Sequence, residues 1–337
     1  MPEFPSHCFN SLLVNHLKSD YYNIENILTN DWLNNFTILQ LNIRSLPAHF
    51  NELLCTLREL PKQPDIIFLC ETWLSDVSNS LYEIDGYSSF HEYRTTKNGG
   101  GVSLYINSLL NPKYNPDISV IDNNFEFLGT SLIINNKLFN ILSCYRPPAG
   151  NVNSFIEKLY SILENLKGNV IIAGDQNICL LHAYNSNDSC KFLNLMVSNG
   201  FSLCNNRPTR INYQNIHNSS LIDHIWTNVN ISLCKSYNLS NVIISDHMPI
   251  VFHIPYSSYN PMKDKATEKI VFRQFFDENI SQFKNSLRRI QWDTLFINQS
   301  IDDSFNIFSI HFYDIFNKCF PIKHKSITKK SKFCALV

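Results

Sequence analysis

The chain has 337 residues, of which 44% are hydrophobic and 13% aromatic, so it is long and apolar enough to bury one large core with an appendage. Its 28 lysines and arginines balance 29 aspartates and glutamates, and a net charge of −1 excludes a protein that attracts nucleic acid through a global basic field. The aromatic content also argues against a disordered chain.

The cysteines and the N-terminal segment indicate the compartment. Ten cysteines are scattered without a C-x-x-C pair, and Cys70, Cys144 and Cys204 lie in apolar runs, where a reduced cysteine behaves as a small hydrophobic residue. Residues 1–20 lack the basic start and continuous apolar stretch of a secretion signal. No apolar run approaches the roughly 20 residues of a membrane helix. We therefore expect an intracellular protein that is neither secreted nor bound to a membrane.

Regular elements are expected from residue 36 onward, after a leader at 1–35 with some helical pattern. The predicted strands, in chain order, are 37–43, 65–70, 99–106, two within 125–145, 170–173, 221–228 and 242–254. The helices predicted among them are 48–60, 154–166 and 188–199. Several strand pairs are joined too tightly for parallel crossovers. Two mixed sheets packed face to face with helices outside therefore fit the pattern better than one doubly wound parallel sheet.

The composition changes after Pro255, which predicts a domain boundary. The segment 256–269 is polar and breaks the earlier periodicity, as a linker would. An apolar helical face follows, formed by Phe305, Phe308, Phe312 and Ile315. The chain then turns basic over 323–332. Residues 256–337 are therefore predicted to be a linker-like helical and basic tail.

The stretch "NVIIAGDQNICL", residues 169–180, contains the first candidate site. An apolar run ends at Gly174, and the carboxylate of Asp175 and the carboxamide of Asn177 follow it. Polar groups cannot stay buried without partners, so their position at the end of a buried strand needs an explanation. Gly-Asp-Gln-Asn suits a simple turn. Alternatively, side chains two residues apart at a strand end point the same way and can share a site.

The same pattern recurs at other strand ends. Polar side chains end or flank apolar runs at Asn42, Glu71, Tyr145, Arg146, Asp223, Asp246 and His247. Each alone has an ordinary explanation as a turn, a helix cap, a strand exit, an ion pair or a core histidine. One shared cluster explains them together more economically than separate caps do.

These residue types suit one kind of chemistry. Carboxylates and carboxamides, without a cysteine–histidine array, favour a hard cation such as Mg²⁺ or Mn²⁺ over structural zinc. A histidine beside a carboxylate can transfer a proton or contact a phosphoryl oxygen. Tyrosine and arginine can stabilise an oxyanion. The combination fits metal-assisted hydrolysis of a phosphoester.

The motifs "LN", "CETWL", "GGGVSLYI", "CYRPP", "GDQN", "SSLIDHIWTN" and "SDHMPI" resemble, in this order, the endonuclease/exonuclease/phosphatase superfamily, which includes DNase I and the apurinic/apyrimidinic endonucleases. More narrowly, "ETWL", "YRPP" and the last two motifs resemble the endonuclease domain of jockey-like non-LTR retrotransposons. The resemblance implies a four-layer α/β/β/α sandwich over residues 36–255. It also implies Mg²⁺-dependent nicking of DNA in the nucleus by a monomeric domain, leaving a 3′-hydroxyl that primes reverse transcription.

Matched motif by motif, the resemblance assigns roles at the metal and the attacking water. Glu71 would be the principal metal ligand, with Asn42 beside it. Asp246 would belong to the metal–phosphate cluster. Asp175 would activate or orient the water, and Asn177 would hold that water or the phosphate.

The resemblance also assigns roles at the scissile phosphate. His247, oriented by Asp223, would contact this phosphate. Tyr145 would stabilise the developing charge, with Arg146 as an electrostatic helper. Further substrate contacts are expected from Thr209, Arg210 and Ser245.

The chain departs from the family pattern at two positions, and its tail shows a further likeness. Gln176 stands where the family usually has an aromatic residue that is not itself a ligand. Arg44, two residues after Asn42, stands where the repair enzymes carry an acidic residue, which argues against a second metal ligand there. The tail resembles the segment that joins this nuclease to a reverse transcriptase. Its basic run is expected either to be solvated or to contact nucleic acid, including the element's RNA, through phosphates.

Two other functions stay open at this point. The same fold could hydrolyse a different phosphoester, such as an inositol phosphate or a sphingomyelin-like phosphodiester. The chain could also be an inactive binding module left by a truncated element. All the principal positions carry the expected residues, which argues against long decay.

Overall fold

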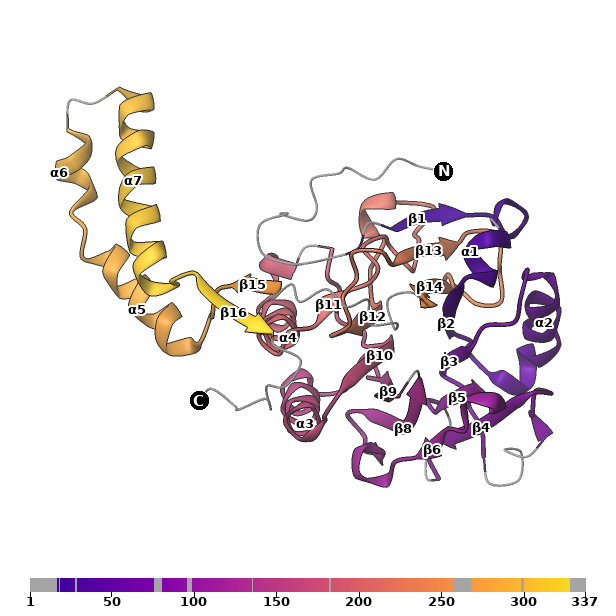
Figure 1. The fold of residues 1–337 in the computed structure, drawn as a ribbon. Helices are drawn as coiled ribbons and strands as arrows, with labels where there is room; N and C mark the ends of the chain where they lie inside the picture. The colour runs from indigo at the N-terminus through magenta and orange to yellow at the C-terminus, as the bar shows by residue number, and fades with distance from the viewer. Residues whose placement is uncertain are drawn as a thin grey trace. The chain divides into compact units, whose positions relative to one another are not determined.

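The computed structural model describes residues 17, 19–27, 29–75, 81–95, 99–134, 136–181, 183–256, 268–297 and 300–327. The chain divides into two compact units, residues 1–262 and 263–337. The described part of the first unit contains two seven-stranded sheets, and the second contains a small two-stranded sheet with helices (Figure 1).

The two large sheets are both mixed. The first has the strand order β1 (Ser19–Tyr22), β13 (Lys235–Leu239), β14 (Ile250–Pro255), β2 (Asn35–Asn42), β3 (Ile66–Cys70), β5 (Val102–Asn107), β4 (Tyr87–Glu92). The second has the order β11 (Ser202–Leu203), β12 (Asp223–Thr227), β10 (Asn169–Asp175), β9 (Lys137–Tyr145), β8 (Glu126–Ile134), β6 (Lys113–Tyr114), with β7 (Val120–Ile121) also on β8.

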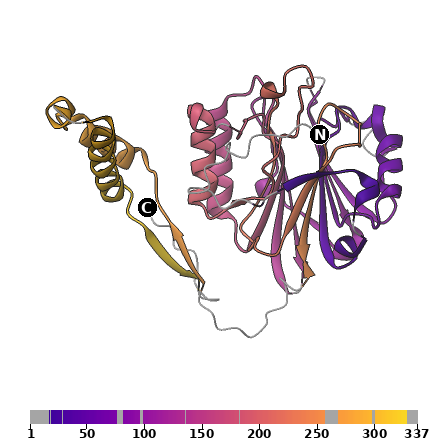
Figure 2. The same ribbon diagram turned by 90° about the horizontal axis from the view of Figure 1, so that it is seen from above.

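Helices cover the outer faces of the two sheets. Figure 2 shows α2 (Leu46–Glu59) on one side and α3 (Val152–Asn165) with α4 (Asn187–Ser198) on the other, with both sheets between them. Each helix is capped by a polar side chain that accepts a hydrogen bond from its first turn: Ser45, Asn151 and Ser186. The predicted four-layer α/β/β/α sandwich is confirmed.

Three apolar layers hold the sandwich together, and alternate residues of one strand belong to different layers. In β2, Ile38 lies in the layer between the sheets, whereas Leu39 lies in the layer under α2. In β10, Ile171 faces the same central layer and Ile172 the layer under α3 and α4. Strands buried on both faces need a continuous apolar run, which is why these strands show no polar alternation.

The register of the strands brings the polar strand ends together. β2 and β3 are parallel, with Asn42 opposite Cys70, the residue before Glu71. β9 and β10 are also parallel, with Tyr145 opposite Asp175, and the antiparallel β12 pairs Asp223 with that same Asp175. These ends meet at one edge of the sandwich, because parallel strands end on the same side of a sheet.

Gly174 lets β10 run close to β9 just before Asp175. Its φ is 150°, and a Cβ at this position would overlap the carbonyl oxygen of Cys144. We expect Gly174→Ala to destabilise the first unit by about 3 kcal/mol, measured by denaturant unfolding. Gly200→Ala is the matched control, because Gly200 has a φ of 82° but no neighbour within 4 Å. It should cost only about 1 kcal/mol. Equal losses in the two variants would show that the close approach contributes nothing.

Part of the segment predicted as a leader contributes to the first sheet. β1 pairs in parallel with β13, so residues 19–22 form an edge of the first sheet. The short helix α1 (Thr29–Leu33) buries Trp32 completely, and its indole Nε1 donates to the Tyr237 hydroxyl at 2.8 Å. Short 3₁₀ helices occupy Ile24–Asn26, Ser108–Leu110, Pro116–Ile118, Ala183–Asn185 and Ile216–Asn218.

The second unit contains α5 (Asp277–Arg288), α6 (Trp292–Phe296), α7 (Ile301–Cys319) and a hairpin of β15 (Glu268–Phe272) with β16 (Lys323–Ile327). On α7, Phe308 packs against Trp292 and Phe312 against Phe283. Phe305, from the same predicted face, is instead 67% exposed. Most of the predicted linker (257–267) and the end of the basic run lie outside the described residues. None of the helices in the described ranges is both long and apolar enough to cross a membrane.

Candidate active site

Asn42 connects the two carboxylates that follow β3 and end β10. Its Nδ2 donates to Glu71 Oε1 at 2.9 Å and to Asp175 Oδ2 at 2.8 Å. The Tyr145 hydroxyl donates to the same Glu71 oxygen at 3.3 Å. Burial raises the pKa of Tyr145, so the phenol stays neutral and keeps its proton for donation. The sequence-predicted residues Asn42, Glu71, Tyr145 and Asp175 therefore lie in one hydrogen-bonded cluster.

The backbone just after two strands is bent to present these groups. Glu71 has a φ of 54°, and the segment after it is held by Thr72 N–H and Trp73 N–H, which donate to the carbonyls of Gly101 and Gly100. Asn177 has a φ of 50°, and its N–H donates to Asp175 Oδ1 at 2.9 Å. Residues other than glycine rarely adopt positive φ, and such strain is concentrated at functional sites.

A histidine–aspartate pair lies beside this cluster. His247 Nδ1 is 2.8 Å from Asp223 Oδ2 and 3.9 Å from Asp175 Oδ2. Asp223 also accepts hydrogen bonds from Thr209 Oγ1 at 2.6 Å and from Gln40 Nε2 at 3.2 Å. With three donors on one buried carboxylate, the orientation of the imidazole is fixed.

The charges of these buried groups depend on one another. Burial and the nearby Asp223 charge raise the pKa of Asp175 to about 7. Burial also acts to raise the pKa of Asp223, but the charge and hydrogen bond of His247 outweigh it and lower that pKa. Burial lowers the pKa of His247, yet Asp223, Asp175 and Asp246 together raise it to about 9. At neutral pH the site therefore contains an imidazolium beside Asp223.

The donor set suits a hard divalent cation. Asp175, Asp223 and His247 each place one potential ligand atom within 4.8 Å of the others. His247 is the weakest candidate of the three, because its Nδ1 is bonded to Asp223 and its ring is protonated. The oxygens of Glu71 and Asp175, bridged by Asn42, fit Mg²⁺ or Mn²⁺ better. The pKa of Asp175 is raised mainly by burial and then by the Asp223 charge, and a bound cation would act in the opposite direction.

Asp246 is bonded to two arginines and not to Asn42, which bridges the other carboxylates. Its Oδ1 accepts a hydrogen bond from Arg44 Nη1 at 2.8 Å, and its Oδ2 accepts one from Arg210 Nε at 2.8 Å and lies 2.6 Å from Arg210 Nη2. Burial raises the pKa of Asp246, but His247, Arg210 and Arg44 outweigh that effect and lower it. Because both oxygens are bonded to arginines, these contacts do not support the predicted role of Asp246 at the metal.

Arg146 lies elsewhere than predicted. Its guanidinium is largely buried and donates to the backbone carbonyls of Gly150, Gln176 and Asn177 at 2.6–2.8 Å. The Asn177 side chain in turn donates to the Arg146 carbonyl at 2.8 Å. Arg146 therefore fixes the loop after Asp175, and these contacts do not support the prediction that it is an electrostatic helper at the phosphate.

The three predicted substrate contacts have different surroundings. Thr209 is buried on Asp223, and Ser245 Oγ donates to the Asn42 carbonyl at 2.6 Å while accepting from His247 N–H at 3.1 Å. Both therefore position other site residues. Arg210 is half exposed beside Asp246 and can reach a substrate.

Comparisons with known proteins identify the family of this chain. The Endonuclease/Exonuclease/phosphatase family matches residues 31–247, well over half of the chain. The chain belongs to the Endonuclease/Exonuclease/phosphatase family. The predicted membership of this superfamily is thus confirmed. A comparison with curated proteins gives no match.

Solved structures of similar fold include several nucleases. The endonuclease domain of TRAS1, a telomere-specific non-LTR retrotransposon, is 16% identical with a TM-score of 0.52, over 66% of this chain and 99% of that one. The 3′-5′ exonuclease NExo from Neisseria meningitidis is 15% identical with a TM-score of 0.51, over 65% and 99%. The catalytic domain of Xenopus laevis APE2 is 19% identical with a TM-score of 0.50, over 65% and 91%. At these identities the likeness establishes the fold.

Several residues that support this family site were missed by the sequence patterns. Gln40 looked like part of an apolar strand, yet it donates to Asp223. Buried Glu126 accepts from the Gly101 N–H at 2.5 Å and pairs with Arg94 at 2.5 Å. A Cβ on Gly100 would overlap that Glu126 carboxylate, so the glycine turn must pack against it without a side chain. The glycine run at 99–101 was the available signal, read only as a turn into a strand.

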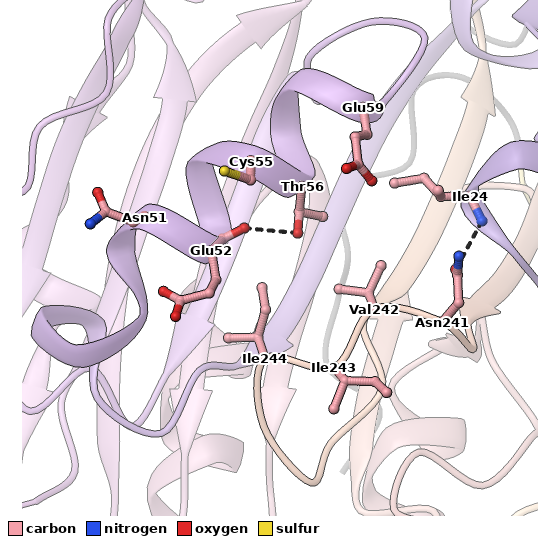
Figure 3. Close-up of a pocket in the computed structure, with 10 residues that line it drawn as sticks. All are labelled: Ile24, Asn51, Glu52, Cys55, Thr56, Glu59, Asn241, Val242, Ile243 and Ile244. Atoms are coloured by element: carbon pink, nitrogen blue, oxygen red, sulfur yellow. Dashed lines mark hydrogen bonds between the residues drawn. The ribbon is translucent and has the colours of Figure 1, made fainter.

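A surface pocket of about 410 Å³ lies between α2 and the loop 241–244 (Figure 3). Its ten lining residues include Glu52 and Glu59 but no lysine, arginine or histidine, and none of them belongs to the site described above. A pocket lined by carboxylates and aliphatic groups is poorly suited to a phosphoester. Of these two places, the strand-end cluster is therefore the better candidate for phosphoester chemistry.

Proposed function

We propose that this chain is a divalent-metal-dependent endonuclease that hydrolyses a DNA phosphodiester and leaves a 3′-hydroxyl. The observation that carries the proposal is the cluster in which Asn42 bridges Glu71 and Asp175 beside the His247–Asp223 pair. The cluster combines oxygen ligands that can bind a hard cation, a carboxylate that can orient a water molecule, and an imidazolium that can contact a phosphate. A metal-assisted phosphodiesterase needs all three.

The residues of the chain would divide the work as follows. Glu71 and Asn42 would hold Mg²⁺ or Mn²⁺, which when bound supplies Lewis-acid stabilisation of charge on the phosphate. Asp175 orients the attacking water, and the loop that Arg146 fixes keeps Asn177 next to it. The protonated His247 donates to a phosphate oxygen and offsets the charge that develops there.

Tyr145 and Ser245 would assist the reaction in two different ways. The Tyr145 hydroxyl, neutral and bonded to Glu71, can turn its proton toward the pentavalent phosphate. Ser245 holds the segment that carries His247 against the end of β2, which keeps the imidazole at a fixed distance from the cluster. Geometry of this kind lowers the barrier by positioning the groups before reaction.

The biological setting follows from the same proposal. Such a nick in target DNA would supply the primer for reverse transcription of a non-LTR retrotransposon, and the protein would act in the nucleus as a monomeric nuclease unit. The basic segment from Lys323 would contact the element's RNA through its phosphates. The TRAS1 endonuclease domain, which belongs to a non-LTR retrotransposon, supports this setting by its fold.

Nicking of supercoiled plasmid by the purified chain tests the proposal. We expect the supercoiled plasmid to be converted to open circles in about 5 to 10 mM Mg²⁺ or Mn²⁺, because Mg²⁺ is bound weakly by few protein ligands. We expect no conversion in excess EDTA. Primer extension by a DNA polymerase from the nicks, without phosphatase treatment, would establish the 3′-hydroxyl. A folded protein that leaves plasmid intact but hydrolyses a soluble phosphomonoester would contradict the endonuclease and favour a phosphatase of the same fold.

A further inference from the structure

Two arginines that the catalytic roles do not use converge on one carboxylate beside the site. Arg44 Nη1 lies 2.8 Å from Asp246 Oδ1, and Arg210 approaches Asp246 Oδ2 with Nε at 2.8 Å and Nη2 at 2.6 Å. Their side chains are 54% and 50% exposed. Asp246 immediately precedes His247, so this arginine pair lies next to the group that faces the scissile phosphate.

The backbone of each arginine is fixed to the catalytic cluster. The Arg44 N–H donates to Asn42 Oδ1 at 3.2 Å, and the next residue, Ser45, donates from its N–H to the Glu71 carbonyl at 2.8 Å. Arg210 forms an isolated β-bridge with Ser220, directly after buried Thr209. The two arginines therefore lie in connecting segments, one after β2 of the first sheet and one before β12 of the second, and both are held in place by residues that build the site.

The charges of this group do not cancel. One carboxylate faces two guanidinium groups, which leaves a net charge of +1 at a half-exposed surface. Each guanidinium carries five N–H donors, of which the hydrogen bonds to Asp246 use one from Arg44 and one from Arg210. The remaining planar donors suit phosphate oxygens, which arginine binds in a bidentate manner. The chain as a whole is slightly acidic, so this local excess is not a consequence of its general charge.

We propose that Arg44 and Arg210, braced by Asp246, form a subsite for the backbone phosphates that neighbour the scissile phosphate of a polynucleotide. The subsite rests on the proposed function and narrows it to a substrate with several phosphates in a row. A single phosphoester has no group to reach it. Arg44 stands where the repair enzymes carry an acidic residue. In this chain that position would therefore contact a phosphate of the substrate backbone.

Binding and cleavage measured side by side test the subsite. Fluorescence anisotropy with a 20-base-pair duplex (about two helical turns) in EDTA gives binding without cleavage. Arg44→Ala and Arg210→Ala should each weaken binding about tenfold. Each should also reduce the slope of log K against log salt by about 1. Arg58→Ala is the matched control, because Arg58 is exposed in the last turn of α2 and far along that helix from Arg44.

A small substrate separates this subsite from the chemistry. With bis(4-nitrophenyl) phosphate, which lacks neighbouring phosphates, both variants should keep kcat/KM within about twofold of the parent chain. Duplex binding equal to that of Arg58→Ala would overturn the proposal. So would an equal loss on duplex and small substrate, which would make the arginines part of the reaction itself.

Failure of the proposed function would look different from failure of the subsite. If the parent chain binds duplex but never cleaves it, and Arg44→Ala lowers that binding, the endonuclease is wrong and the subsite stands. Asp246→Asn tests the brace: it should leave the Mg²⁺ concentration for half-maximal cleavage unchanged. A shift of about tenfold in that concentration would make Asp246 a metal ligand and would overturn its role as the brace.

Discussion

Replacing Asp175 with asparagine is expected to lower the rate of DNA nicking by about a thousandfold, because the neutral amide can neither orient the attacking water as a base nor help to hold the cation. The fold should survive, since asparagine keeps an acceptor for the Asn177 N–H that now bonds to Asp175 Oδ1. Single-turnover nicking of plasmid, beside circular dichroism of both proteins, measures this. A loss below about tenfold would place the attacking water elsewhere.

Asp175→Asn is also expected to change how the stability of the folded protein depends on pH. Burial and Asp223 raise the pKa of Asp175 from 3.8 to about 7, so the folded protein holds this proton more tightly than the unfolded chain. Ionisation of Asp175 therefore destabilises the folded state progressively between these two values, and the full cost applies above about pH 7. In EDTA, Asp175→Asn should melt at a higher temperature relative to the parent chain at pH 8 than at pH 5. The lost acceptor for Asn42 is the same at both pH values and cancels in this comparison.

Much of the fold could be predicted from the sequence because its strands are buried on both faces. The apolar runs at 37–43, 65–70 and 170–173 stand out for this reason, and they correspond to β2, β3 and β10. The helix predicted at 154–166 likewise corresponds to α3, whose apolar face packs under the second sheet. Edge strands such as β4 were missed, since their half-buried residues carry polar groups that mask the pattern.

The site could be located in part for a different reason. Strand ends with Asp, Asn, Glu and His are visible in a sequence, but the register that brings them together is not. The strand predicted at 242–254 illustrates the limit: only Ile250–Pro255 is a strand, and the residues before it form the loop that carries Asp246 and His247. Pro249 and the polar Ser245 were signs of that loop.

Partners of a residue are also invisible before folding. Arg146 and Arg210 both looked like cations near a phosphate, yet one is buried against backbone carbonyls and the other is half exposed. The Glu126–Arg94 pair was missed because its members are separated by 32 positions in the numbering and neither lies in a recognisable motif. Such long-range pairs depend on sheet packing, which single-chain periodicity does not report.

The second large effect is expected at the His247–Asp223 pair. His247→Ala should lower the nicking rate by about a thousandfold, because the imidazolium that offsets charge on the phosphate is lost. Asp223→Asn should cost nearly as much, since Asp223 is the main group that raises the pKa of His247 to about 9. Thr209→Val, which removes one of the hydrogen bonds to Asp223, should have a clearly smaller effect. Single-turnover rates of the three variants, ranked at one pH, check the order.

The double variant decides whether the two residues act as one unit. If Asp223 works through His247, His247→Ala with Asp223→Asn should be no slower than His247→Ala alone, because residues that act together lose activity non-additively. Multiplied losses would instead give Asp223 a separate role, such as binding the cation. The pH profile is a second measurement of the same coupling. The imidazolium is present below the folded pKa, so the rate of the parent chain should fall as the pH rises through about 9, and Asp223→Asn should move that fall to lower pH.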